Sequence, residues 1–204
     1  MKKIFTILGL VSATTIMFAQ TNLVQNPGFE SDLTSWAAGT GSGYTAPAIL
    51  TTNPHSGLKL AAYELPSATT GFYQNVAIAG STQYTLTFWY KASTARPEGT
   101  TQNNIFRLWS VMKDTTGAPV YNSATANDDP LRSNNGYLQI APTAWTQHTV
   151  VFTSHPSAAS IDVAFRSYGS GSSYVDDVQL VQGLLAVTDV SAFDKSVKMN
   201  TVVG

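Results

Sequence analysis

Apolar and polar side chains alternate along residues 22–183 in short runs that are separated by turn residues. Six runs are rich in Val, Thr, Tyr, Phe and Trp and carry an apolar side chain at every second position, as β-strands with one buried face do. They predict strands at 71–78, 83–92, 104–113, 145–153, 159–168 and 174–182. Weaker patterns of the same kind predict strands at 44–51, 58–63 and 137–140.

These residues lack the spacing of apolar side chains that is typical of a helix. No stretch of twelve or more residues keeps apolar side chains at i, i+3, i+4 and i+7. Turn signals such as Asn26-Pro27-Gly28 and Asn53-Pro54 recur between the strands. Strands without crossover helices pair antiparallel. The pattern therefore predicts an all-β fold, an antiparallel β-sandwich or jelly roll, with long loops at 93–103 and 122–135.

Residues 1–19 predict a secretory signal peptide. Lys2 and Lys3 precede an apolar stretch from Ile4 to Phe18, and the small residue Ala19 follows. This is the order of regions in a signal that is cleaved on export. We expect cleavage after Ala19 and a secreted or cell-surface product whose mature chain does not insert into a membrane. An uncleaved N-terminal anchor is the alternative.

Residues 184–204 differ from the chain before them. Lys195 and Lys198 lie within the last ten positions, and the strand-like pattern breaks off at Gly204. The segment resembles the opening of the C-terminal sorting domains carried by type IX secretion substrates of Bacteroidota. That resemblance implies the start of such a sorting domain, and a flexible tail is the alternative.

Composition narrows the class of partner. Charged residues make up 11% of the 204 residues, whereas an ordinary domain carries about 25%. Hydrophobic residues make up 43% and the formal net charge is −1. This balance argues against a nucleic-acid binder, which needs a basic face. The absence of cysteine excludes disulfides, thiolate nucleophiles and cysteine-based metal sites.

Three groups of segments follow one another in an order that resembles a known family. They are Asn22-Leu23-Val24-Gln25-Asn26-Pro27-Gly28-Phe29-Glu30 with Trp36, then Gln74-Asn75-Val76 with the strand 80–92, and finally Trp145 with Tyr174-Val175-Asp176-Asp177-Val178-Gln179-Leu180. Together they resemble carbohydrate-binding modules of the family 4/9/22 type, which are β-jelly rolls of the galactose-binding-like superfold. The resemblance covers nearly all of 22–183 and implies a domain that binds a polysaccharide or oligosaccharide. The same superfold also serves adhesion and protein-interaction modules.

The resemblance further implies a structural calcium ion between the first and last strands. On the matching positions the ligands are the carboxylates of Glu30 and Asp176, with backbone carbonyls at Gly28 and Lys59. Asp176 also shares strand parity with Leu180, so we expect it on the core face, where a carboxylate needs a partner. The alternative is that Glu30 and Asp176 cap turns or accept backbone N–H bonds.

Strand parity predicts a ligand surface as well. The side chains expected on non-core faces are aromatic or arginine: Trp89 on 83–92, Arg107 and Trp109 on 104–113, and Arg166 and Tyr168 on 159–168, with Tyr44, Tyr137 and Gln139 as weaker candidates. Flat rings and planar polar groups suit sugars. If these strands share one sheet, its face is a groove for a glycan chain. The alternative is that the tryptophans are packed, as we expect for Trp36 and Trp145.

The inventory of catalytic groups is thin. A glycosidase needs two carboxylates about 5–9.5 Å apart, and the adjacent pairs Asp128-Asp129 and Asp176-Asp177 do not predict that arrangement. The three histidines lack metal-binding spacing, and no serine-nucleophile or phosphate-loop motif is present. We therefore predict a non-catalytic, monomeric domain that binds neutral polysaccharide. The alternatives are a cell-surface adhesion or protein-interaction module and a small secreted polysaccharide hydrolase.

Overall fold

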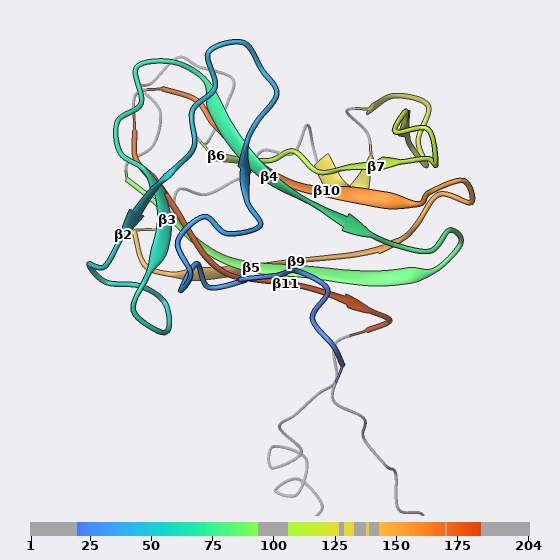
Figure 1. Ribbon diagram of the computed structural model, residues 1–204, viewed down its shortest axis with the longest axis horizontal. Coiled ribbons are helices and arrows are strands. Elements are labelled where there is room, and N and C mark those ends of the chain that lie inside the picture. The colour runs from blue at the N-terminus through green and yellow to red at the C-terminus, as the bar shows by residue number, and fades with distance from the viewer. Residues whose placement is uncertain are drawn as a thin grey trace, which may run out of the picture. The chain divides into compact units, whose positions relative to one another are not determined.

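The computed structural model describes residues 20–93, 106–126, 129–132, 138, 143–169 and 171–184, and the described residues from Thr21 onward belong to one compact unit. Two antiparallel sheets stack face to face in it (Figure 1). Sheet A has the order β1 (Ala37–Ala38), β4 (Thr70–Ala77), β10 (Ser160–Ser167), β7 (Val111–Lys113) and β8 (Pro119–Val120), with β6 (Phe106–Leu108) also paired to β10. Sheet B has the order β2 (Ala48–Leu50), β3 (Leu60–Tyr63), β11 (Ser173–Gln182), β5 (Gln83–Ala92) and β9 (Thr146–Thr153).

The all-β prediction is confirmed, and most strands begin and end within two residues of their predicted limits. The predicted strand 104–113 is wrong as one element, because it divides into β6 and β7 at Trp109 and Ser110. The sequence pattern missed β1 and β8, which have two residues each and are too short to show alternation. In the described part of the chain, no helix has the length and apolar character to cross a membrane. The predicted signal peptide, the predicted tail segment and the strand 137–140, apart from Leu138, lie outside the described residues.

The core between the sheets is built around Phe165 of β10. Its ring lies 5.3 Å from that of Phe72 and 5.6 Å from that of Phe106, both in sheet A, and 4.9 Å from Phe88 of sheet B. Trp36 is buried beside Phe165, as predicted. These contacts cross from one sheet to the other, so they hold the two layers together.

A β-bulge in β11 changes the face on which Asp176 lies. Asp176 pairs with Trp89 and Leu180 pairs with Leu86, and the register shifts between Asp176 and Gln179. The extra residue reverses the alternation of side chains. Leu180 therefore faces the core, whereas Asp176 lies on the outer face with Trp89. The prediction that Asp176 shares the core face with Leu180 is wrong, because the parity rule assumed an unbroken strand.

Replacing Phe165 tests whether the sheets depend on this aromatic packing. We expect Phe165→Ala to lower the free energy of unfolding by about 3–5 kcal/mol, because it leaves a cavity among rings from both sheets. The measurement is urea denaturation. The control is Val151→Ala on the outside of β9, where the side chain is 46% exposed and the expected change is within about 0.5 kcal/mol. Equal losses in the two variants would contradict this account of the core.

Candidate functional site

The outer face of sheet A carries side chains that β10 and its neighbours direct away from the core. Phe165 pairs with Leu108 and both are buried in the core, so the next pair, Arg166 and Arg107, projects from the opposite face. Trp109 follows β6 and donates its backbone N–H to the carbonyl oxygen of Ala164 at 2.8 Å. Strand pairing thus brings three residues of the predicted ligand surface together: Arg107, Trp109 and Arg166.

Three guanidinium groups lie over the Trp109 ring, and we call them the arginine cluster. The central carbon of Arg166 lies 3.8 Å from the centroid of the indole, that of Arg132 3.9 Å and that of Arg107 4.1 Å. Each is well inside the range of a cation–π contact. The guanidinium groups occupy the space over the indole. A sugar ring could stack on Trp109 only by displacing them.

Aromatic rings extend this stack on both sides. Arg166 also lies over the Tyr44 ring at 5.5 Å, and Arg132 lies over the Tyr121 ring at 5.4 Å. Arg107 donates from Nη1 to the hydroxyl of Tyr168 at 3.2 Å. Tyr168, which was predicted for the ligand surface, therefore lies beside the cluster and binds one of its members.

Arg132 comes from a loop that the sequence pattern left without assigned chemistry. It ends a short 3-10 helix, η2 (Pro130–Arg132), whose turn is held by Asp129 through the backbone N–H groups of Leu131 and Arg132. Its Nε donates to the carbonyl oxygen of Ser110 at 3.4 Å. The only sequence signal for it was its place in a long loop, since strand parity does not apply there.

Burial and like charge both act on Arg132. Burial lowers the pKa of its guanidinium, the charges of Arg107 and Arg166 lower it further, and Tyr121 and Asp129 oppose them. Arg107 and Arg132 are each 6% exposed, so the repulsion between them is only weakly screened by water. The cluster is thus a concentration of positive charge that is held in place by aromatic rings.

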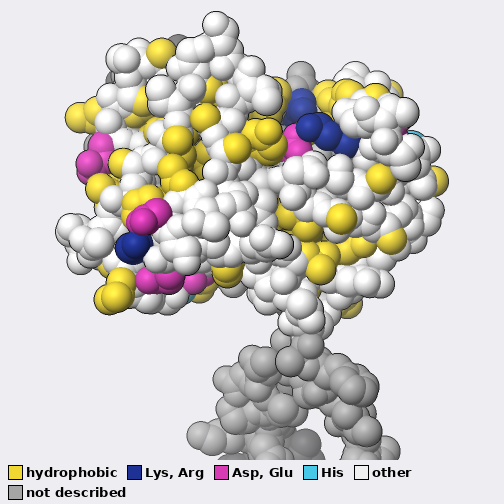
Figure 2. Space-filling view, viewed as in Figure 1, with side chains coloured by type: hydrophobic (Ala, Val, Ile, Leu, Met, Phe, Trp, Pro, Cys, Tyr) yellow, Lys and Arg dark blue, Asp and Glu magenta, His cyan; other side chains and the backbone are white. Residues whose placement is uncertain are grey.

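A pocket of about 100 Å³ opens beside the cluster. Its wall includes Tyr44, Tyr73, Trp109 and Arg166. Gly71 lies opposite Arg166 in the strand register, and a Cβ there would come within 3.4 Å of Tyr44 and 2.6 Å of a backbone oxygen. A side chain at this position would therefore collide with the main chain of β10. In Figure 2, Lys and Arg side chains gather beside an acidic side chain in a hollow of the molecule.

The acidic residue in the pocket wall, Asp162, is already bound on both oxygens. Lys113 approaches Oδ2 at 2.6 Å, and the side-chain amide of Asn75 donates to Oδ1 at 2.8 Å. Its charge is therefore matched by Lys113 rather than by the arginine cluster.

Two sequence predictions about tryptophan are wrong. Trp89 belongs to β5 in sheet B, so it does not share a surface with Trp109; alternation predicts the face of a residue but not its sheet. Its ring stacks on His55 at 3.9 Å. Trp145 is only partly buried, donates from Nε1 to the carbonyl of Asn53 at 3.1 Å, and does not belong to the core. Tyr137 and Gln139 lie outside the described residues.

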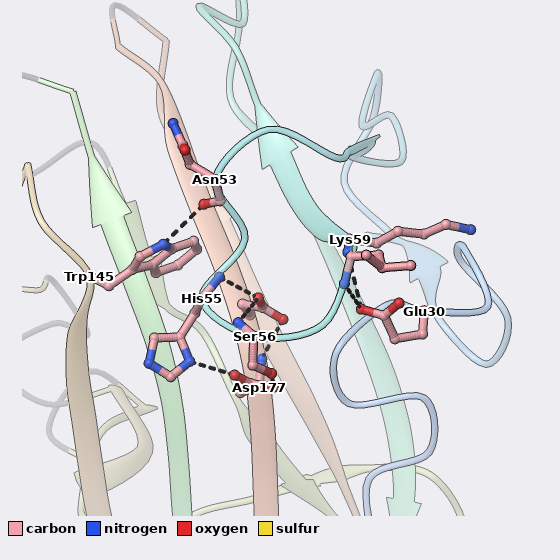
Figure 3. A network of polar contacts seen from close by, with 9 residues as sticks. Glu30, Asn53, His55, Ser56, Lys59, Trp145 and Asp177 are labelled. Carbon is pink, nitrogen blue, oxygen red and sulfur yellow. Dashed lines mark hydrogen bonds and ion pairs between the residues drawn. The ribbon is translucent and has the colours of Figure 1, made fainter.

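A second polar network fastens the loop 53–59 to β11 (Figure 3). Asp176 Oδ2 accepts the backbone N–H groups of His55 at 2.8 Å and Ser56 at 3.3 Å. Asp177 binds the side chains of the same two residues, at 2.5 Å to His55 Nδ1 and 2.8 Å to Ser56 Oγ. His55, to which the sequence pattern assigned no role, is thus bound through both its backbone and its side chain.

Glu30 fastens the other end of this loop. Its Oε1 accepts the backbone N–H groups of Leu58 at 2.8 Å and Lys59 at 3.0 Å. Gly57 has φ of +61°, and any side chain there would collide with Glu30. Glu30 and Asp176 therefore bind the two ends of one loop. Both carboxylates accept hydrogen bonds from backbone N–H groups, which was the alternative to their binding calcium.

The expected calcium ligands come only partly together. A Cβ at Gly28 would lie 3.4 Å from Asp177 Oδ1 and 3.6 Å from Asp176 Oδ1, so the main chain at Gly28 passes both carboxylates. These oxygens suit a hard cation. Among the described residues, however, no group of three acidic or histidine side chains is arranged to hold a metal. The chemistry fits calcium at Asp176 and Asp177, whereas Glu30 binds the loop farther along.

Asp176 is fully buried, and this changes its acidity. Its pKa is raised from 3.8 to about 6, mainly by burial and also by the charge of the neighbouring Asp177. The hydrogen bonds from the backbone N–H groups of Asp177, Ser56 and His55 oppose this rise. The carboxylate thus loses more by leaving water than its hydrogen bonds restore.

Comparison with known proteins identifies the fold. No protein-family model matches the chain, and no curated protein is similar to it in sequence. Among solved structures, a family 16 carbohydrate-binding module is similar with a TM-score of 0.55 and 22% identity over 78% of this chain and 99% of that one. The CBM22-1 xylan-binding domain of Paenibacillus barcinonensis Xyn10C has a TM-score of 0.54 and 13% identity over 82% and 98%.

A third similar structure comes from a larger protein. It is the enzymatically active domain of tailspike protein 4 of bacteriophage CBA120, with a TM-score of 0.60 and 16% identity over 79% of this chain. This chain spans 21% of that protein's length. At these identities the likenesses establish the fold, and the prediction of a jelly-roll sandwich is confirmed.

The raised pKa of Asp176 predicts a particular pH dependence of stability. Between about pH 4 and pH 6 the folded chain keeps a proton on Asp176 that the unfolded chain has lost, so stability falls as pH rises through this window, by roughly 3 kcal/mol. Urea denaturation in calcium-free buffer with EDTA measures it. Asp176→Asn should remove this decline, whereas the pH dependence of stability that other titratable groups cause should remain. Identical pH profiles for the variant and the wild type would contradict the assignment.

Proposed function

We propose that the domain binds a glycan chain on the outer face of sheet A. The observation that carries this proposal is the pocket in which Tyr44, Tyr73 and Trp109 stand beside Arg166. The rings of Tyr44 and Tyr73 offer apolar contact to the C–H faces of sugars, and the guanidinium of Arg166 can donate to their oxygens. The jelly-roll fold supports the proposal, since two similar structures are named as carbohydrate-binding modules.

Binding without hydrolysis fits the carboxylates of this face better than catalysis does. Asp162 is held by Lys113 and Asn75. Both oxygens of Asp129 accept backbone N–H groups, from Leu131 and Asn122. A glycosidase needs one carboxyl group that can donate a proton to the departing sugar. Carboxylates whose oxygens are already bound by cations and N–H donors are poorly placed for that role.

The low overall charge of the sequence favoured a neutral polysaccharide as the ligand. The predicted signal peptide implies that the domain is exported. Both stay predictions. The rival function is an adhesion or protein-interaction module on the same fold, in which the pocket would hold a side chain of another protein.

Affinity electrophoresis against soluble neutral and acidic polysaccharides tests the proposed function. We expect at least one polysaccharide to retard the domain, and we expect Trp109→Ala to weaken that binding at least tenfold, because the arginine cluster loses the ring that positions it. Trp145→Ala is the matched control on sheet B and should bind as the wild type does. No retardation by any polysaccharide would contradict the proposal and favour the adhesion module.

We also propose that calcium binds at Asp176 and Asp177 and stabilises the fold. Asp176 is fully buried, and the charge of the adjacent Asp177 opposes its ionisation. A divalent cation removes that cost, and Gly28 places main-chain atoms beside both groups. The role is structural, since the pair holds the loop 53–59 through His55 and Ser56.

Chelation tests the calcium proposal. EDTA should lower the melting temperature, and added calcium should restore it, because a ligand that binds only the folded state stabilises that state. Asp177→Asn should abolish the response to calcium. Equal melting temperatures with EDTA and with millimolar calcium would contradict the calcium proposal. The loop would then be held by the hydrogen bonds to His55 and Ser56 alone.

A further inference from the structure

We propose that the glycan is acidic, carrying a carboxylate or a sulfate ester, and that the arginine cluster binds this group through Arg166. The inference rests on the proposed function and changes its substrate class from neutral to anionic. Arg166 lines the pocket, whereas Arg107 and Arg132 do not and are each only 6% exposed. An anion in the pocket would therefore meet one guanidinium directly and feel the charge of two more.

Like charges lie close together on this face. Lys113 and Asp162 form a pair of their own at 2.6 Å. The negative charge of Asp129 raises the pKa of Arg132 and so acts against the charges of Arg107 and Arg166. Three guanidinium groups thus lie against a single indole, and the charges of Arg107 and Arg166 repel that of Arg132.

Burial makes this repulsion among the guanidinium groups costly. Like charges in a partly desolvated site repel more strongly than in water, and the lowered pKa of Arg132 reflects that repulsion together with burial. Arg166 adds a buried Nε–H that has no hydrogen-bond partner among the described residues. A carboxylate or sulfate against Arg166 would offset both costs, since two parallel N–H donors of a guanidinium match two oxygens of either group.

A neutral sugar would use this arrangement poorly. Its hydroxyls can accept from Arg166, but they bring no charge to offset the repulsion among three cations. The indole stack adds to this argument, because guanidinium groups cover Trp109 where a neutral pyranose would otherwise lie. Selectivity for an acidic chain follows from the charge of the site rather than from the charge of the whole protein.

Matched pairs of glycans test the inference by isothermal titration calorimetry. The pairs differ only in the acidic group: polygalacturonate with its carboxyl-reduced form, β-1,4-polymannuronate with β-1,4-mannan, and a sulfated galactan with its desulfated form. In 50 mM NaCl we expect the acidic member of at least one pair to bind roughly tenfold or more tightly than its neutral partner, and 500 mM NaCl to weaken that binding by about tenfold. Comparison of the first two pairs with the third distinguishes carboxylate from sulfate.

Other outcomes separate this inference from the proposed function. Neutral members that bind as tightly as acidic ones, with little effect of salt, would overturn the inference and leave glycan binding standing. No binding within any pair would overturn the inference, and it would overturn the proposed function as well if no polysaccharide retards the domain in affinity electrophoresis.

Variants of Arg166 locate the anion. Arg166→Gln should weaken binding of the acidic glycan by roughly tenfold or more and remove the preference over its neutral partner. Arg166→Lys keeps the charge but loses the paired donors, so its affinity for the acidic glycan should lie between that of the wild type and that of Arg166→Gln. Lys91→Gln removes an equal charge from sheet B and should bind as the wild type does. Acidic binding that is unchanged in a folded Arg166→Gln would overturn the assignment, and the matched glycans test the inference even if that variant unfolds.

Discussion

The pairing of β10 determines both the core and the proposed binding face. This strand pairs with β4 along one edge and with β6 and β7 along the other. Because side chains alternate along a strand, Phe165 enters the aromatic core while Arg166, the next residue, joins the arginine cluster. The backbone bond from Trp109 to Ala164 then places the indole over β10 where β6 ends. A shift of one residue in this pairing would exchange core and surface.

The other sheet is fastened by a different chemistry. In a chain without cysteine, the loop 53–59 links an early turn to the last strand through carboxylates (Figure 3). Glu30 holds one end of the loop, and Asp176 with Asp177 holds the other. The bulge in β11 makes this possible, because it turns Asp176 out of the core and under the loop. The same burial that makes Asp176 a firm anchor also raises its pKa.

Alternation along single strands predicts a large part of this structure and a smaller part of the site. It correctly placed Arg107, Trp109 and Arg166 on a non-core face, because Arg107 and Arg166 lie within β6 and β10 and Trp109 directly follows β6, before the alternation is interrupted. It could not assign Trp89 to sheet B, since the period of a strand is the same in either sheet. It misplaced Asp176 because a bulge leaves no mark on the pattern. Arg132 escaped it altogether, as loop residues are positioned by contacts such as the bond to Ser110 and not by a period.

The indole N–H groups of the four tryptophans offer the most direct test of where a ligand binds. Two-dimensional ¹⁵N–¹H NMR resolves one signal for each, and titration with a polysaccharide that binds follows them separately. A ligand on the outer face of sheet A should shift the Trp109 signal and leave those of Trp89 and Trp145 unchanged. Shifts at Trp89 or Trp145 with Trp109 unmoved would place the ligand on sheet B and contradict the account.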